Sequence, residues 1–241
     1  MFFHIALLFS IVFIANAAEL PPFIIPCSRH LLDLNECISN NLEDAKPYLA
    51  EGVPELSIPS LKHVTIPYSF INKTNFECGV WNFNISGFEN FNVLKVDADL
   101  KKNLFKFQLE FPAGEAIGSY GCKGNFLNLN MDGTGPFEIN ATQLIVNLEL
   151  KTKLVQRNGL TYFQQVYKHL DARIDGVFFF YMHDLYLGNN EITEIMNRIL
   201  NENSMYVFNV LSPILKERLG SLLDKAIDNF FEIYTYDELL P

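Results

Sequence analysis

The stretch EITEIMNRILNENSMYVFNVLSPILKERLGSLLDKAIDNFFEIY, residues 191–234, decides the fold of this chain. Its large apolar residues recur in steps of three and four, which is the spacing of one α-helical face. The charged residues fall mostly on the other side. The pattern predicts a helix of about 40 residues, roughly 60 Å long. A helix of this length with one apolar face needs an equally long partner.

Pro213 lies inside the predicted helix and predicts a kink or a break there, because proline removes one backbone donor and clashes with the preceding turn. Asn201, Asn203 and Ser204 interrupt the apolar stripe just before it. Two consecutive helices therefore remain an alternative to one long helix.

The middle of the chain supplies the partner. From Phe76 onward apolar and polar residues alternate with a period of two, in residues 81–86, 105–111, 127–132, 144–151 and 170–175. This period predicts antiparallel strands with one apolar face and one polar face. Turns are expected at Pro112–Gly114, residues 132–136 and Asn158-Gly159. The run 177–182 is apolar on both faces and is expected to be the most buried strand.

The region before the sheet contains a second predicted helix. Ser28 is a suitable N-cap for a helix that carries apolar residues at helical spacing from Leu31 to Leu42. Pro47 is expected to kink or end this helix, and Gly52 to stop whatever remains of it.

The N-terminus has the pattern of a secretory signal peptide. Residues 5–14 form an apolar run that is too short to span a bilayer, and Ala15-Asn16-Ala17 is a small-x-small cleavage site. We expect a signal peptide at 1–17, a single domain at 18–241, and a secreted, extracellular protein. No later run is long and uncharged enough for a transmembrane helix, so stable membrane insertion is not expected.

Sequons and cysteines agree with secretion. The glycosylation sequons begin at Asn72, Asn84 and Asn140. Four cysteines allow three pairings. Cys27 with Cys37 is favoured because the loop is short, and Cys78 with Cys122 would then join two strands; two free thiols are the alternative for the second pair.

Charge and composition exclude several functional classes. The net charge is −10, with no basic patch in the sequence, which argues against binding to nucleic acid or to anionic membranes. Ser119 lacks the spacing of a nucleophile elbow, and the histidines show no zinc-type pair. Gly133-Thr134-Gly135 has no helix after it to cradle a phosphate. We expect no enzymatic activity, no cofactor and no metal.

Several local strings resemble the insect takeout / juvenile hormone-binding protein family. The resemblance covers nearly all of residues 18–241 and rests on 20–29 with Cys37, 52–61, Gly118–Tyr120 with Gly124 and Gly133–Gly135, 180–189, 200–203 with Pro213, and the tail 234–241. Met205 replaces a tryptophan common in the family, Leu240 replaces a phenylalanine, and Cys78 and Cys122 are additional to the usual N-terminal pair.

The resemblance implies an α+β fold in which a strongly curved antiparallel sheet wraps a long C-terminal helix around an internal hydrophobic tunnel. Periodicity alone favours a solid core; the tunnel follows from the resemblance. The resemblance further implies a haemolymph carrier of a small apolar ligand, a juvenile hormone-like terpenoid or a long-chain lipid. The alternative is a membrane-surface lipid-binding or lipid-transfer protein that uses the long helix as an amphipathic face. The oligomeric state stays open.

The alternation in the strands and the helical spacing predict which residues line the tunnel. The inward-facing candidates are Phe105, Phe107, Leu109, Leu127, Leu129, Val146, Leu148, Phe178, Phe180, Val207, Leu211 and Ile214. A slip of one residue in any strand would exchange its two faces. Tyr181 and His183 are candidate polar anchors, with surface positions as the alternative.

Overall fold

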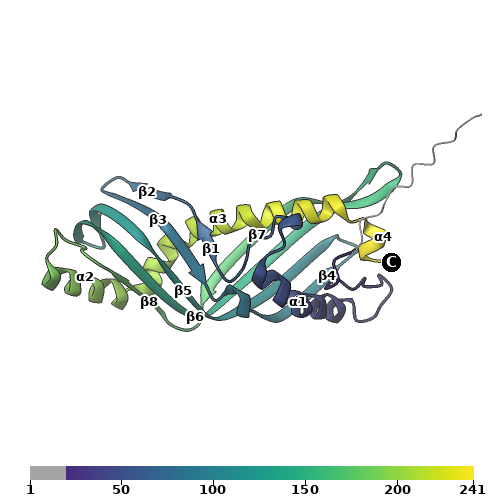
Figure 1. Ribbon diagram of the computed structural model, residues 1–241, viewed down its shortest axis with the longest axis horizontal. Helices are drawn as coiled ribbons and strands as arrows, with labels where there is room; N and C mark the ends of the chain where they lie inside the picture. The colour runs from purple at the N-terminus through teal and green to yellow at the C-terminus, as the bar shows by residue number, and fades with distance from the viewer. Residues whose placement is uncertain (1–19) are drawn as a thin grey trace, which may run out of the picture.

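A long C-terminal helix lies along a curved antiparallel sheet (Figure 1), as predicted. The structure is a computed structural model that describes residues 20–241. The predicted signal peptide, residues 1–17, lies outside the described residues. The elements are α1 (Leu34–Glu51), η1 (Pro54–Leu56), β1 (Val64–Ile66), β2 (Ser69–Lys73), β3 (Phe76–Ser86), η2 (Phe88–Asn90), β4 (Asn92–Asp99), β5 (Leu104–Phe126), β6 (Leu129–Arg157), β7 (Leu160–Ile174), β8 (Phe178–Met182), α2 (Asn190–Glu202), α3 (Ser204–Ile233) and α4 (Tyr236–Leu239).

Two very long strands, β5 and β6, form the central pair of the sheet. β5 has 23 residues and β6 has 29, and they pair from Leu104↔Lys151 to Phe126↔Leu129. The order is β1-β3-β5-β6-β7, while β2 pairs with β3, β4 with β5 and β8 with β6. In Figure 1, α2 lies at one end of this sheet, and α1 and α4 lie at the other.

Two of the predicted turns are wrong. Pro112–Gly114 and residues 132–136 lie inside the continuous strands β5 and β6. The turn between these strands is Leu127-Asn128, both with positive φ, so Leu127 does not belong to the predicted strand 127–132. The Asn158-Gly159 hairpin is confirmed between β6 and β7.

Gly133 and Gly135 allow another segment of backbone to pack closely against β6. A Cβ at Gly133 would lie 2.0 Å from the carbonyl oxygen of Asp184, and one at Gly135 would lie 2.8 Å from that of His183. The segment before α2 therefore crosses β6 backbone to backbone, which only glycine permits.

The long C-terminal helix is broken, but not at Pro213. α2 ends at Glu202 and α3 begins at Ser204, while Pro213 lies inside α3 at an exposed position. The side chain of Asn203 donates to the carbonyl of Ile199 at 2.8 Å and thereby satisfies one acceptor at the C-terminal end of α2. The two-helix alternative is therefore confirmed, with its break at Asn203.

The first helix begins later than predicted. Residues 28–33 form two turns, at 29–30 and 32–33, and α1 starts at Leu34 with Asp33 as its N-cap, so the Ser28 cap is wrong. Pro47 lies inside α1 without ending it, and Gly52, at φ 90°, follows the last helical residue.

Strand β8 is not the most buried strand. Phe179 is 44% exposed and Val177, just before the strand, is 63% exposed. Among the strands β8 pairs with β6 alone. Its other edge is covered by α2, where Asn197 hydrogen-bonds both the N–H and the C=O of Met182, and Asn201 those of Phe180. The two asparagine side chains thus take the place of a neighbouring strand.

The interior has two different ends. At the α2 end, buried residues of β1, β3, β5, β6 and β8 gather beneath the first half of α3. At the α1 end, Phe105, Leu150 and Phe163 pack with Ile227 and Phe231 of α3. We call the second cluster the solid end.

A polar seam joins α3 to β7 between the two ends. Lys216 of α3 pairs with Asp171 of β7 at 2.9 Å, and Lys168 of β7 pairs with Asp224 of α3 at 2.6 Å. Gln165 also donates to Asp224 at 2.7 Å. The side chain of Lys168 is only 11% exposed. These bonds fix the helix to one edge of the sheet.

The ion pairs of this seam are expected to make the free energy of unfolding depend on pH. The hydrogen bond from Lys216 lowers the pKa of Asp171. Burial raises the pKa of Asp224, but the bonds from Lys168 and Gln165 outweigh it, and the net pKa is lowered. A carboxyl group whose pKa is lowered on folding stabilises the folded state at pH values above its pKa in the unfolded chain, about 3.9. This stabilisation is lost as the pH falls through the pKa of the folded state.

We therefore expect the double variant Asp171→Asn, Asp224→Asn to be less stable than the parent by about 1–2 kcal/mol at pH 7. The difference should shrink as the pH falls below about 3.9. Urea unfolding at pH 7 and pH 3 measures it. Asp228→Asn, at an exposed position of α3, is the control and should show no pH-dependent difference. A gap that stays constant with pH would contradict this role of the seam.

Candidate functional site

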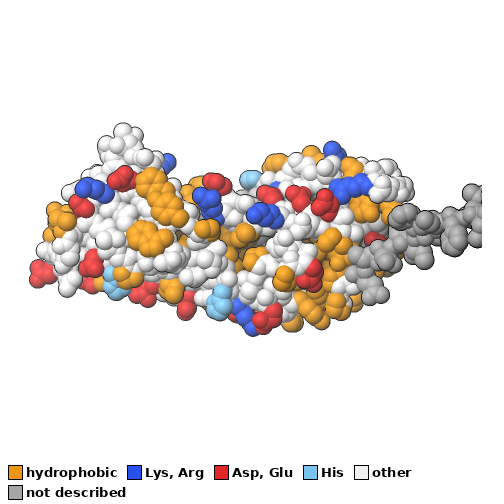
Figure 2. All heavy atoms as spheres, turned by 45° about the horizontal axis from the view of Figure 1, so that its top comes forward, with side chains coloured by type: hydrophobic (Ala, Val, Ile, Leu, Met, Phe, Trp, Pro, Cys, Tyr) orange, Lys and Arg blue, Asp and Glu red, His pale blue; other side chains and the backbone are white. Residues whose placement is uncertain are grey.

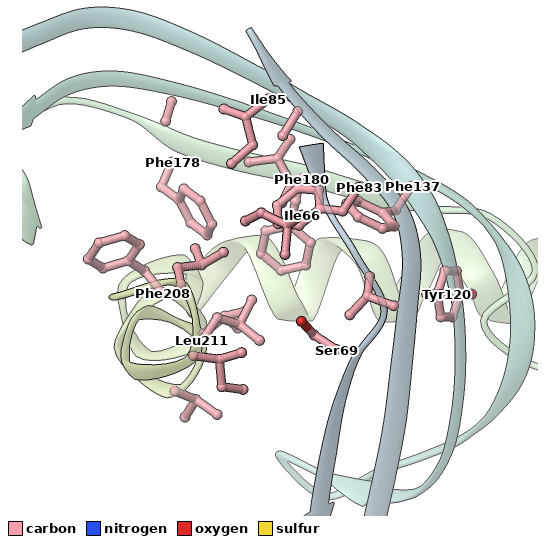
Figure 3. Close-up of a pocket in the computed structure, with 18 of the residues that line it drawn as sticks. Ile66, Ser69, Phe83, Ile85, Tyr120, Phe137, Phe178, Phe180, Phe208 and Leu211 are labelled. Carbon is pink, nitrogen blue, oxygen red and sulfur yellow. The ribbon is translucent and has the colours of Figure 1, made fainter. Parts of the chain in front are cut away.

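A cavity of about 200 Å³ lies between the curved sheet and the first half of α3. Its wall comes from β1, β2, β3, η2, β5, β6, β7, β8, α2 and α3. Figure 3 shows the aromatic side chains Phe83, Phe137, Phe178, Phe180 and Phe208 around the space. The wall is almost entirely apolar, which suits an apolar molecule.

Few polar groups reach the wall. Ser69 of β2 is 5% exposed, and its hydroxyl has one hydrogen bond in the described part of the chain, a long one of 3.5 Å to the carbonyl of Pro67. Figure 3 shows Ser69 opposite Leu211 of α3. The charged residues on the wall are Glu115 of β5 and Arg218 of α3, both exposed. Ser69 is the buried hydroxyl best placed to bond a ligand inside the cavity.

The phenol of Tyr120 is hydrogen-bonded within the protein. Tyr120 lies on the wall, but its hydroxyl donates to the carbonyl oxygen of His183. Burial, and then the charge of Asp184, raise the pKa of this phenol, which stays neutral. The bond ties the segment before α2 to β5, and so it supports the α2 end of the cavity.

Five of the predicted tunnel residues lie on the cavity wall: Phe178, Phe180, Val207, Leu211 and Ile214. Phe105 and Phe107 belong to the solid end. Leu109, Val146 and Leu148 are half-buried along the strands between the two ends. Leu127 and Leu129, at the β5–β6 turn, are half-buried against the core at the α2 end. Contact of any of them with a ligand stays a prediction.

The inward face of β5 and β6 changes along their length. In β5 the inward residues are odd-numbered from Phe105 to Phe111 and even-numbered from Gly114 to Cys122, although the exposed Glu115 also borders the cavity. In β6 the parity changes at Gln143, whose φ is 51°, opposite Pro112. An extrapolation of one parity from the solid end therefore misses cavity residues such as Ala116 and Phe137.

The predicted polar anchors are not part of the cavity wall. The Tyr181 hydroxyl donates to Glu194 of α2 at 2.5 Å, and the imidazole of His183 lies 4.0 Å from Glu138. The side chain of His183 is 48% exposed. The structure thus places both residues on the outside, between β6, β8 and α2.

Both predicted disulfides are present. Cys27–Cys37 joins the N-terminal arm to α1, and Cys78–Cys122 joins β3 to β5. Both sulfurs of the second pair belong to residues on the cavity wall. The alternative of two free thiols is therefore wrong.

The three sequon asparagines lie on strands. Asn72 of β2 and Asn140 of β6 are exposed. Asn84 of β3 is half-buried, and its side chain accepts from Thr65 and donates to the carbonyl of Asn82. Glycosylation of all three stays a prediction.

Residues 20–241 lack two other kinds of feature, a metal-binding cluster and a membrane-spanning helix. In this range no group of three His, Cys, Asp or Glu residues could hold a metal ion. No helix in the same range has the length and apolarity needed to cross a bilayer. On the face seen in Figure 2, acidic and basic side chains are intermixed rather than gathered by sign.

Comparison with known proteins gives one family match. The family model described as haemolymph juvenile hormone binding protein matches residues 5–241. No curated protein sequence gives a significant match.

A solved structure shares the fold. The crystal structure of Epiphyas postvittana Takeout 1 superposes with a TM-score of 0.78 at 17% sequence identity, covering 86% of this chain and 95% of that chain. A crystal structure of a lipopolysaccharide binding protein aligns with a TM-score of 0.38 at 12% identity, over 78% of this chain and 37% of that chain.

Proposed function

Because this chain belongs to the haemolymph juvenile hormone binding protein family, we propose that it is a carrier which holds one small apolar molecule in the cavity beneath α3. The observation that carries the proposal is the cavity wall, which combines many aromatic and aliphatic side chains with very few polar groups. A core built only for stability is packed without such a space.

The physical basis of binding is the transfer of apolar surface from water. A ligand that buries about 400 Å² of apolar surface gains roughly 10 kcal/mol at about 25 cal/mol per Å². Loss of translational and rotational freedom offsets several kcal/mol of this gain. The net expectation is an affinity of about 1 mM to 1 μM for a molecule that fills the cavity.

The nature of the ligand follows from the wall. With so few polar groups, the cavity suits a terpenoid or a long-chain lipid with its polar part at one end. Ser69 is the proposed hydrogen-bonding partner inside, in place of Tyr181 and His183.

The proposal extends to where the protein works. The signal-peptide pattern at 1–17, the two disulfides and the exposed sequons Asn72 and Asn140 support a secreted protein in extracellular fluid such as haemolymph, with 18–241 as one domain. The family is one of binding proteins, and the proposed function includes no catalytic step.

Mass spectrometry tests the proposal most directly. The full chain is secreted from a eukaryotic host, purified, and measured both natively and after organic extraction. We expect a co-purified apolar molecule of defined mass, bound one to one. After its removal, the protein should bind an apolar fluorescent probe. A protein that purifies empty and binds no probe would overturn the carrier function. Strong co-sedimentation with liposomes would favour the membrane-surface alternative.

A further inference from the structure

Arg218 is the one basic side chain on the cavity wall among the described residues. It follows Leu211, Ile214 and Leu215 on α3 at helical spacing, so it lies on the stripe that faces the cavity. The residue is exposed, so its aliphatic stem borders the apolar wall while its guanidinium reaches water at the cavity mouth.

The guanidinium of Arg218 is unpaired within residues 20–241, where no carboxylate oxygen lies within 4.0 Å of it. The neighbouring basic residues of the seam differ: Lys216 pairs with Asp171 and Lys168 pairs with Asp224. The cation that borders the cavity is therefore the one left available for a ligand.

The other charged residue on the wall, Glu115, favours an orientation in which the negative group of a ligand lies near Arg218. Glu115 lies on β5 and forms no ion pair with Arg218. A ligand carboxylate is repelled near Glu115 and attracted near Arg218. An amphiphile with a negative head thus binds with its tail inside and its head toward Arg218.

We propose that Arg218 selects a long-chain monocarboxylic acid over its neutral ester. The inference rests on the proposed function and names the ligand class and the residue that distinguishes it. The guanidinium binds a carboxylate through two parallel N–H···O bonds, which an ester cannot accept in the same way. Because the pair is exposed to water, its effect on affinity is modest and decreases with salt.

The test compares hexadecanoic acid with its methyl ester. Both displace an apolar fluorescent probe from the delipidated full-length protein at pH 8, where the acid is ionised, and below the concentration at which either ligand aggregates. We expect the acid to bind roughly fivefold more tightly than the ester at low salt. Arg218→Gln should remove this preference by weakening the acid alone, and Arg218→Lys should keep part of it.

The matched control is Arg198→Gln, which removes the same side chain from an exposed position of α2 away from the cavity wall. It should leave both affinities unchanged. Equal binding of acid and ester by the unmodified protein would overturn the role of Arg218 while the carrier function stands. So would an Arg218→Gln variant that weakens both ligands alike. Failure of both ligands to bind would overturn the carrier function together with this inference.

Discussion

Replacing Asn197 by leucine is expected to destabilise the protein by about 3 kcal/mol. For a chain of this size, that lowers the melting temperature by roughly 6–12 °C. Asn197 is 3% exposed, accepts from the N–H of Met182 at 3.0 Å and donates to its C=O at 2.8 Å. Leucine has a similar volume but no polar atoms. The variant therefore leaves a donor and an acceptor of β8 without partners in a buried place.

The matched control is Asn209→Leu on the exposed side of α3, where the asparagine side chain has no hydrogen bond to another described residue. The chemical change is the same, and the expected effect is within about 0.5 kcal/mol. Thermal and urea unfolding measure both variants. If Asn197→Leu is no less stable than Asn209→Leu, α2 does not substitute for a strand at the edge of β8.

Replacing Ala116 by phenylalanine is expected to reduce the affinity for an apolar ligand by about a hundredfold or more. Ala116 is 7% exposed, lies on the cavity wall, and pairs with Ile85 and Ile139, which also line the cavity. A phenyl ring there occupies a large part of a space of about 200 Å³. The ring takes the place of the ligand, so lost binding comes from exclusion rather than from lost contacts.

The control for Ala116→Phe is its neighbour on the other face of β5. Ile117 is 60% exposed, so Ile117→Phe adds a ring at nearly the same backbone position without entering the cavity. Probe titration is expected to show unchanged binding for Ile117→Phe. Circular dichroism and the melting temperature check that both variants fold. Full binding by a folded Ala116→Phe variant would place the ligand elsewhere.

The type of each major element was predictable from the sequence, but several boundaries were not. Periods of 3.6 and 2 are local, so they showed the helix within 191–234 and the antiparallel strands after Phe76. The predicted turns and helix break were wrong where tertiary contacts determine the local structure. Gly133 looked like a turn because glycine permits turns, yet here it permits the backbone of Asp184 to approach. Pro213 predicts a kink or a break in the helix, but the break occurs at Asn203.

The position of the cavity was less predictable than the fold. Alternation within a strand gives two faces, but it cannot show that β5 and β6 exchange them near Pro112 and Gln143. Phe105 and Phe111 are inward, and so is Ala116, although its number has the other parity. Residues of α3 and β8 were placed better, because each of these elements keeps one face inward along the relevant stretch. Arg218 and Ser69 carried no sequence signal that distinguished them from surface residues.

The continuity of β5 and β6 has a thermodynamic consequence. Each strand runs from the cavity to the solid end, so one ladder of backbone hydrogen bonds serves both. We expect the ladder to open as one cooperative unit, so that the two ends share a common free energy of opening. A ligand bound at one end stabilises the other by mass action. Amide protons around Phe105 and Leu150 should then exchange more slowly with solvent when the distant cavity is filled.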